Sequence, residues 1–267
     1  MLTDFVLLGL WASLATAHGT VSGVVADGVY YTGYSLNFQY MNPIPTTAGW
    51  SIPKDQSLGP LTPDQFSSPD INCHVSATPG QTSVAIKAGG QLELQWTPWP
   101  ESHKGPVMDY LANCNGPCET VDKTTLQWFK IDGVGLIDNS VQNGKWASDV
   151  MIANNNSWTV TIPADIAQGN YVIRHETIAL HEAGSQNGAQ AYPQCVNLAI
   201  SGSGTAKPDG VVGTALYKAT DPGILINIYT TLSTYPVPGP TPYSGAVSLS
   251  QTAPPAPTAS ATGVPAL

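Results

Sequence analysis

Short runs of β-branched and aromatic residues, separated by glycine, proline and other turn residues, recur along most of the chain. The first two runs, residues 21–25 and 29–31, flank Asp27-Gly28, a dipeptide that favours the tight turn of a β-hairpin. Further apolar and alternating runs predict strands at residues 92–96, 126–131, 158–162, 171–181, 195–200 and 224–229. Helical patterns are limited to single turns near residues 110–112 and 164–167. Because strands follow one another without intervening helices, the pattern predicts an all-β antiparallel β-sandwich with long loops, one of them at residues 42–69.

The two ends of the chain differ in composition from its middle. Residues 5–14 are apolar and precede Ala15-Thr16-Ala17, which supplies the small residues of a signal-peptide cleavage site. We therefore expect residues 1–17 to be a signal peptide, although basic residues are missing from its start, and His18 to become the first residue. From residue 244 onward Ser, Thr, Ala and Pro predominate, which predicts a disordered tail at residues 244–267. One folded domain is expected between them, at residues 18–243.

The composition narrows the choice of partner. Of the 267 residues, 42% are apolar, enough for a sizeable core, whereas only 10% are charged. The formal net charge is −9 and Arg174 is the only arginine, so nucleic acid and anionic membrane surfaces are disfavoured. A neutral polysaccharide or a small molecule remains as the expected partner. One N-glycosylation motif occurs, at Asn155 in a polar turn.

The chain contains four cysteines, which in a secreted protein suggests two disulfides with three possible pairings. Cys114 and Cys118 flank the turn sequence Asn-Gly-Pro, and this favours a local bridge between them. Cys73 would then pair with Cys195 and close a long loop, which constrains the unfolded chain more strongly. A zinc site is the alternative, but the sequence lacks paired C-x-x-C spacing.

His18 is a candidate metal ligand because signal-peptide cleavage would place it at the amino terminus. Such a residue offers two nitrogen ligands, its α-amine and its ring, and one further imidazole would complete a three-nitrogen set that suits copper. His103 lies in a loop between Pro100 and Gly105. From local sequence alone it is equally an exposed surface histidine, and spacing does not pair it with His18.

The segment at residues 174–181 alternates as a strand does. His175, Thr177, Ala179 and His181 share one face, whereas Arg174 and Glu176 share the other and could pair. We interpret His175 as a hydrogen-bonded core residue. His74, beside a cysteine, has the same structural interpretation.

Taken together, these residues resemble a family, the fungal lytic polysaccharide monooxygenases of auxiliary activity family nine. The resemblance runs from His18 to about residue 240 and rests on long, ordered motifs. They are HKGPV at 103–107 continuing to YLA at 110–112, RHE at 174–176 leading to IALH at 178–181, GAQAYPQC at 188–195, DPGI at 221–224 and YPVPGP at 235–240.

The resemblance implies a copper "histidine brace" of His18 and His103, with Tyr192 as the axial ligand and His181 and Gln190 beside the copper. It implies an immunoglobulin- or fibronectin III-like sandwich and oxidative cleavage of cellulose at C1 and/or C4. The oxidant would be dioxygen or hydrogen peroxide, and a small-molecule reductant or cellobiose dehydrogenase would donate electrons to a secreted monomer. Both disulfide pairings proposed above agree with the family.

By the same resemblance, a tyrosine ring is expected to stack on a sugar. Tyr235 is the stronger candidate and Tyr229 the weaker. Each has a structural alternative, because Tyr229 could belong to an apolar strand and Tyr235 could anchor the Pro-Gly-Pro turn that follows it.

Other functions are weighed against this one. A glycoside hydrolase needs two carboxylates across the scissile bond, and no motif singles out a pair among the acidic residues. A carbohydrate-binding module would not explain His18, His103 and Tyr192 together. A copper-binding surface protein could keep His18 without oxidising a polysaccharide. A zinc peptidase is disfavoured because the sequence after His181-Glu182 does not complete H-E-x-x-H.

Overall fold

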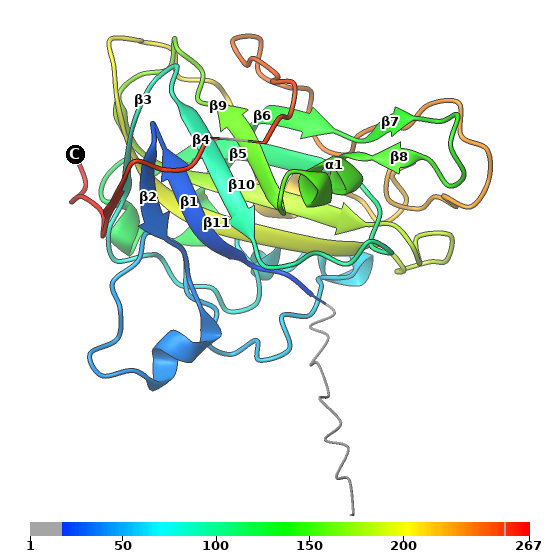
Figure 1. Cartoon of the computed structure of the whole chain (residues 1–267), viewed down its shortest axis with the longest axis horizontal. Coiled ribbons are helices and arrows are strands. Elements are labelled where there is room, and N and C mark those ends of the chain that lie inside the picture. The colour runs from blue at the N-terminus through cyan, green and yellow to red at the C-terminus, as the bar shows by residue number, and fades with distance from the viewer. Residues whose placement is uncertain (1–17, 254) are drawn as a thin grey trace, which may run out of the picture.

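The computed structural model describes residues 18–253 and 255–267, which form two packed β-sheets with long connecting loops (Figure 1). The signal peptide expected at residues 1–17 lies outside the described residues. Among the helices that are described, none has the length and apolar character needed to cross a membrane.

The first sheet has five strands in the order β13-β2-β1-β4-β9. Its strands are β1 (Val21–Ala26), β2 (Val29–Thr32), β4 (Gln91–Trp96), β9 (Ser157–Thr161) and β13 (Ala259–Ala261). The predicted hairpin is β1–β2, turning at Asp27 and Gly28, both of which have positive φ. Its strands pair antiparallel except for β13, which adds to β2 in parallel.

The second sheet has six strands in the order β12-β6-β5-β10-β11-β3. Its strands are β3 (Val84–Lys87), β5 (Val107–Asn113), β6 (Gln127–Val134), β10 (Gly169–Ala179), β11 (Gln190–Ser201) and β12 (Val211–Val212). The long β10–β11 ladder pairs Ala179 with Gln190 and Thr177 with Tyr192. It therefore fixes the positions of Gln190 and Tyr192, two of the candidate site residues. The two sheets confirm the predicted immunoglobulin-like sandwich.

The remaining elements are short. A hairpin of β7 (Leu136–Asp138) and β8 (Lys145–Trp146) leads directly into the one α-helix among the described residues, α1 (Ala147–Ala153). Single 3₁₀ turns occur at η1 (Leu36–Tyr40), η2 (Pro63–Gln65), η3 (Pro69–Ile71), η4 (Cys118–Thr120), η5 (Lys123–Thr125) and η6 (Gly213–Ala215).

Three local predictions are wrong. Residues 110–112 are not helical but lie in β5, where they pair with β6 and β10. Residues 164–167 form a turn with isolated bridges from Ile166 and Ala167 instead of a helix. Residues 224–229 are turns and not a strand, because the N–H groups of Ile224 and Leu225 bond locally to the Asp221 carbonyl.

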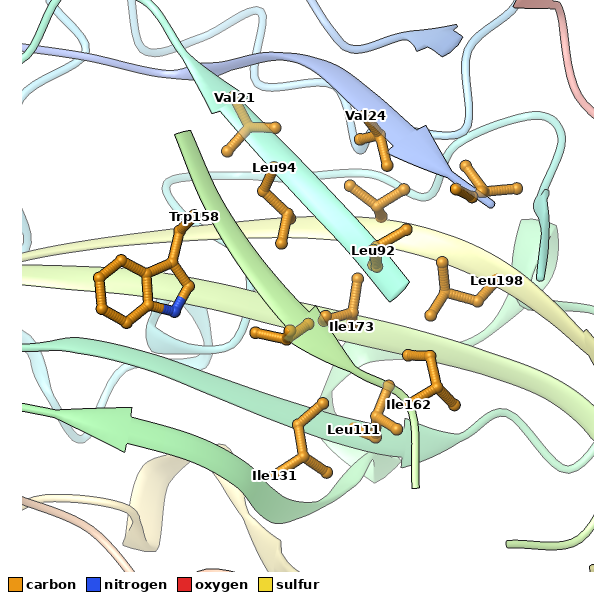
Figure 2. Close-up of a cluster of buried hydrophobic side chains, with 14 of the residues drawn as sticks. Val21, Val24, Leu92, Leu94, Leu111, Ile131, Trp158, Ile162, Ile173 and Leu198 are labelled. Atoms are coloured by element: carbon orange, nitrogen blue, oxygen red, sulfur yellow. The ribbon is translucent and has the colours of Figure 1, made fainter. Parts of the chain in front are cut away.

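Two hydrophobic clusters cover the two faces of the second sheet. The first lies between the sheets, where Leu94 and Trp158 of one sheet face Ile173 and Leu198 of the other (Figure 2). The second cluster lies on the opposite face of the second sheet and is closed by loop residues such as Trp50 and Phe66. The long loops are therefore packed parts of the fold.

Both disulfides have the predicted pairing. Cys73 bonds Cys195 and Cys114 bonds Cys118, with Cα–Cα distances of 5.2 and 5.3 Å. The first bridge ties the segment that follows the long loop at residues 42–69 to β11. The loop itself bonds β11 through Trp50 N–H and Leu61. These ties bring the Ser57 carbonyl to the ring of His18.

The described residues of the C-terminal segment differ from the disordered tail expected from composition. They cross from one edge of the first sheet to the other. Gln251 exchanges hydrogen bonds with the backbone of Thr159 on β9, and β13 extends the sheet beyond β2. Val264 then pairs with Ser83 of the loop before β3. The segment therefore covers two sheet edges that would otherwise be open.

Candidate metal centre

Three residues expected as metal ligands converge at one end of the sandwich. His18 precedes β1, His103 lies in the β4–β5 loop, and Tyr192 lies near the start of β11. The ring centroid of His18 is 6.1 Å from that of His103 and 5.6 Å from that of Tyr192. His18 and His103 are each partly exposed, whereas Tyr192 is buried. Residues that are 85 and 174 positions from His18 along the chain thus form one cluster open to solvent on the histidine side.

Trp99 contacts two members of this cluster, His103 and Tyr192. Its indole N–H donates to the His103 carbonyl at 3.0 Å, and its ring packs edge-to-face on Tyr192 with centroids 5.0 Å apart. The ring of Trp96 packs in turn against Trp99 at 5.3 Å. A buried indole needs a hydrogen-bond partner, and here the partner also fixes the loop that carries His103.

A second set of buried hydrogen bonds begins at Trp96. Its indole N–H donates to His175 Nε2 at 2.7 Å, which leaves Nδ1 to donate to Asp109 at 2.7 Å. His175 is fully buried, so its interpretation as a hydrogen-bonded core residue is confirmed. Arg174 and Glu176 form the predicted pair on the other face of β10, with an N–O distance of 2.7 Å.

His181 and Gln190 lie beside the three candidate ligands. The ring of His181 is 4.1 Å from that of His103, and its buried Nδ1 has no hydrogen-bond partner among the described residues. Tyr192 donates its hydroxyl proton to Gln190 Oε1 at 2.9 Å. The amide nitrogen of Gln190 is therefore the group left to donate elsewhere.

The pKa directions fit a metal site. Burial, together with the neighbouring rings of His181 and His18, lowers the pKa of His103 to about 4. Burial also lowers the pKa of His181 and raises that of Tyr192, with Asp55 adding to the latter effect. At neutral pH the imidazoles of His103 and His181 are uncharged and the Tyr192 phenol keeps its proton, so metal binding at His103 displaces no proton.

The donor set fits copper. The set contains two imidazoles, a phenol oxygen and, once the peptide bond to residue 17 is cut, the amine of His18. It is rich in nitrogen and carries little charge, which copper prefers. Within the described residues, no group of three or more His, Cys, Asp or Glu side chains is placed to hold a metal ion. His74 takes no part in the cluster, because it is buried beside Asp55 as its structural interpretation expected.

The candidate sugar-stacking tyrosines differ in exposure. Tyr235 is partly buried, donates its hydroxyl proton to the Gly223 carbonyl at 2.7 Å and packs edge-on against Trp146. Tyr229 is 61% exposed and is not part of a core strand. Tyr229 is therefore the more accessible of the two rings, whereas the resemblance ranks Tyr235 first; which of them stacks on a sugar stays a prediction.

Sequence reasoning missed one further exposed ring. Tyr40, at the end of η1, is 75% exposed and contacts Gln56, which adjoins the Ser57 that reaches His18. The only signal in the sequence is an aromatic residue in a polar, proline-rich stretch. Asn155 lies exposed in the turn between α1 and β9, as expected for a glycosylation site.

The fold and the site define a class: an immunoglobulin-like β-sandwich protein with a solvent-facing, nitrogen-rich candidate metal centre at one end. Comparison with known proteins agrees with this class. The profile of Auxiliary Activity family 9 (formerly GH61) matches residues 18–235. The chain therefore belongs to Auxiliary Activity family 9, whose members are copper-dependent oxidoreductases that cleave polysaccharides oxidatively.

Individual relatives give the same result. The AA9 family lytic polysaccharide monooxygenase I of Botryotinia fuckeliana (strain B05.10) is 66% identical over 253 residues, 94% of each chain. The AA9 family lytic polysaccharide monooxygenase B of Aspergillus tamarii is 58% identical over 237 residues, 89% of this chain and 63% of the relative. The extended catalytic domain of H. jecorina LPMO9A has a TM-score of 0.87 at 51% identity and covers 93% of this chain and all of that one. Fungal members of the family are secreted.

Proposed function

We propose that this protein is a copper-dependent monooxygenase that cleaves cellulose oxidatively at C1 and/or C4. The observation that carries the proposal is the convergence of His18, His103 and Tyr192 at an open end of the sandwich. The activity resides in residues 18–243, and a signal peptide at residues 1–17 directs secretion. Dioxygen or hydrogen peroxide is the oxidant, and a small reductant or cellobiose dehydrogenase supplies electrons to the monomer.

His18, through its ring and freed amine, and His103 would hold one copper ion, with the Tyr192 oxygen on the buried side. Bound copper supplies redox chemistry that activates the oxidant for removal of hydrogen from a strong C–H bond. The protein contributes a rigid setting for the two histidines, because Trp99 holds the His103 backbone and packs on Tyr192. A site pre-formed in this way loses little free energy to rearrangement when the metal binds.

His181 and Gln190 are proposed to orient the oxidant. Gln190 accepts from Tyr192 through Oε1, so its Nε2 can donate toward the open side of the cluster. His181 adds a neutral imidazole whose buried Nδ1 lacks a partner among the described residues, so the ring can accept or give one proton locally. Both groups lie at the two ends of the loop that joins β10 and β11.

The exposed rings of Tyr40 and Tyr229 are proposed to contact the sugar rings of cellulose. A flat aromatic ring suits the apolar face of a pyranose and does not demand a chain end, so an extended surface can bind. Tyr235, although expected to stack, supports the loop by packing on Trp146.

The test is product analysis with the secreted, copper-loaded protein on phosphoric-acid-swollen cellulose, with ascorbate and peroxide. Mass spectrometry should detect lactone, aldonic acid or 4-keto oligosaccharides, which disappear without reductant and in the His18→Ala variant. Sugars of native mass alone would instead indicate a hydrolase. Tight copper binding without products would leave a copper-binding protein.

A further inference from the structure

A groove lies between the β7–β8 hairpin and the loop at residues 228–232. Its volume is about 430 Å³, within the usual range of small-ligand sites. Asn139 of the hairpin donates to the Ser233 carbonyl at 3.2 Å and joins the two walls. Figure 1 shows the orange loop passing close to the hairpin at the end of the sandwich where β10 and β11 are joined.

The lining of the groove is neutral and rich in hydrogen-bonding groups. Amide side chains come from the hairpin at Asn139, Gln142 and Asn143, and hydroxyl groups come from Thr230 and Thr231 of the loop. No charged residue is among the lining residues, all of which the structure describes. Such walls suit a neutral, hydroxyl-rich ligand and offer nothing to a phosphate or a carboxylate.

Both walls are attached to the elements that carry the candidate site. The Ile226 N–H donates to the Ala183 carbonyl at 2.8 Å, and Ala183 is two residues from His181. Asn227 then accepts from the Tyr229 N–H at 2.9 Å, so the exposed ring is positioned from the same loop. On the other wall the hairpin continues into α1, where Asp149 pairs with Lys104, the neighbour of His103. Each wall of the groove is thus joined by one contact to a segment that carries a candidate site residue.

We propose that the groove is a lateral subsite for a neutral pyranose that lies beside the glucan being cut. The amides and hydroxyls bind its hydroxyl groups, and the Tyr229 ring borders it. Two sources share this chemistry, a sugar substituent on the same glucan and a sugar of the neighbouring chain in crystalline cellulose. The inference rests on the proposed function for its substrate class, but the groove binds without copper chemistry.

The test removes two groove side chains that make no hydrogen bond among the described residues, Gln142 and Thr231. The variant is the double substitution Gln142→Ala/Thr231→Ala, and the matched control is Gln127→Ala, an exposed glutamine of β6 outside the groove. Calorimetry on the copper-loaded protein without reductant measures binding of cellotetraose and of the xyloglucan heptasaccharide with the same backbone. Adsorption to crystalline cellulose is measured alongside.

If the ligand is a substituent, the branched oligosaccharide should bind the wild type about tenfold more tightly than cellotetraose, and the double variant should lose that difference. If the ligand is a neighbouring chain, the two oligosaccharides should bind alike, and only adsorption of the double variant to crystalline cellulose should fall. Equal behaviour of the wild type and the double variant toward all three ligands would overturn the subsite. Because none of these measurements needs a reductant, failure of the oxidative chemistry would show separately, as missing oxidised products.

Discussion

At the scale of single residues, the position of His103 depends on the Trp99 indole beneath it. The Trp99→Phe substitution keeps an aromatic ring against Tyr192 but removes the donor to the His103 carbonyl. One neutral hydrogen bond contributes about 1 kcal/mol, so the copper dissociation constant of the mature protein should rise about fivefold. Calorimetric copper titration measures the change, and electron paramagnetic resonance reports whether the coordination is altered.

Trp158→Phe is the control for this prediction. Trp158 also donates its indole N–H in the buried interior, to Asp132 at 2.9 Å, but belongs to β9 and does not touch the histidines. The Trp158→Phe substitution should lower the free energy of unfolding while leaving the copper affinity unchanged. If Trp99→Phe binds copper as tightly as the wild type, then Trp99 does not position His103.

At the scale of elements, β10 and β11 could be predicted although they are buried almost throughout, whereas β5 could not. In β5, Leu111 faces the cluster between the sheets while Tyr110 and Ala112 face the outer cluster, so its pattern is nearly continuous. Conversely, residues 224–229 alternate like a strand but bond within their own turns. The C-terminal segment pairs through its backbone and through Gln251, and composition does not report backbone pairing.

Strand pairing also places two buried carboxylates opposite each other, and this predicts a pH effect. Asp132 of β6 faces Asp109 of β5, and burial together with Asp109 raises the pKa of Asp132 to about 6. The folded protein thus holds a proton that the unfolded chain releases near pH 4, so this group makes stability fall as pH rises from about 4 to 6. Asp132→Asn should remove that part of the fall, of order 2–3 kcal/mol between the two limits.

Urea unfolding of the wild type and of Asp132→Asn across this pH range measures the difference. The asparagine can still accept from Trp158 and bond Ser248, so the comparison isolates the titration. The variant should gain relative to the wild type as pH rises. A constant difference between the two proteins at every pH would show that Asp132 does not titrate in this window.

At the scale of the whole molecule, the candidate site combines parts that the sequence presents separately. Its residue types were predictable from motifs, but nothing in their spacing pairs His18 with His103, and only the resemblance joined them. The ladder between β10 and β11 places Tyr192, and Trp99 packs on Tyr192 while it donates to the His103 carbonyl. The His18 ring lies 5.6 Å from that of Tyr192. Exposure could not be predicted: Tyr229 is 61% exposed, whereas Tyr235 is partly buried and donates to the Gly223 carbonyl.

The two disulfides should contribute very unequally to the stability of this assembly. Cys73 and Cys195 are separated by 122 positions, whereas Cys114 and Cys118 are separated by 4. On the chain-entropy estimate, removing the first bridge costs about 5 kcal/mol and removing the second costs about 2 kcal/mol. The first bridge also fixes the chain just after the long loop whose Ser57 carbonyl contacts His18, so its loss should weaken copper binding as well.

Cys73→Ala/Cys195→Ala and Cys114→Ala/Cys118→Ala form a matched pair for thermal unfolding and copper titration. Both pairs remove the same atoms, so the difference between them reports the length of chain that each bridge closes and the loop that it holds. The first variant should unfold at the lower temperature and bind copper more weakly, whereas the second should keep wild-type copper affinity. Equal losses of stability in the two variants would show that the unfolded chain is not constrained by loop length. Unchanged copper affinity in the first would show that the hydrogen bonds of Trp50 and Leu61 to β11 hold the long loop in place without the disulfide.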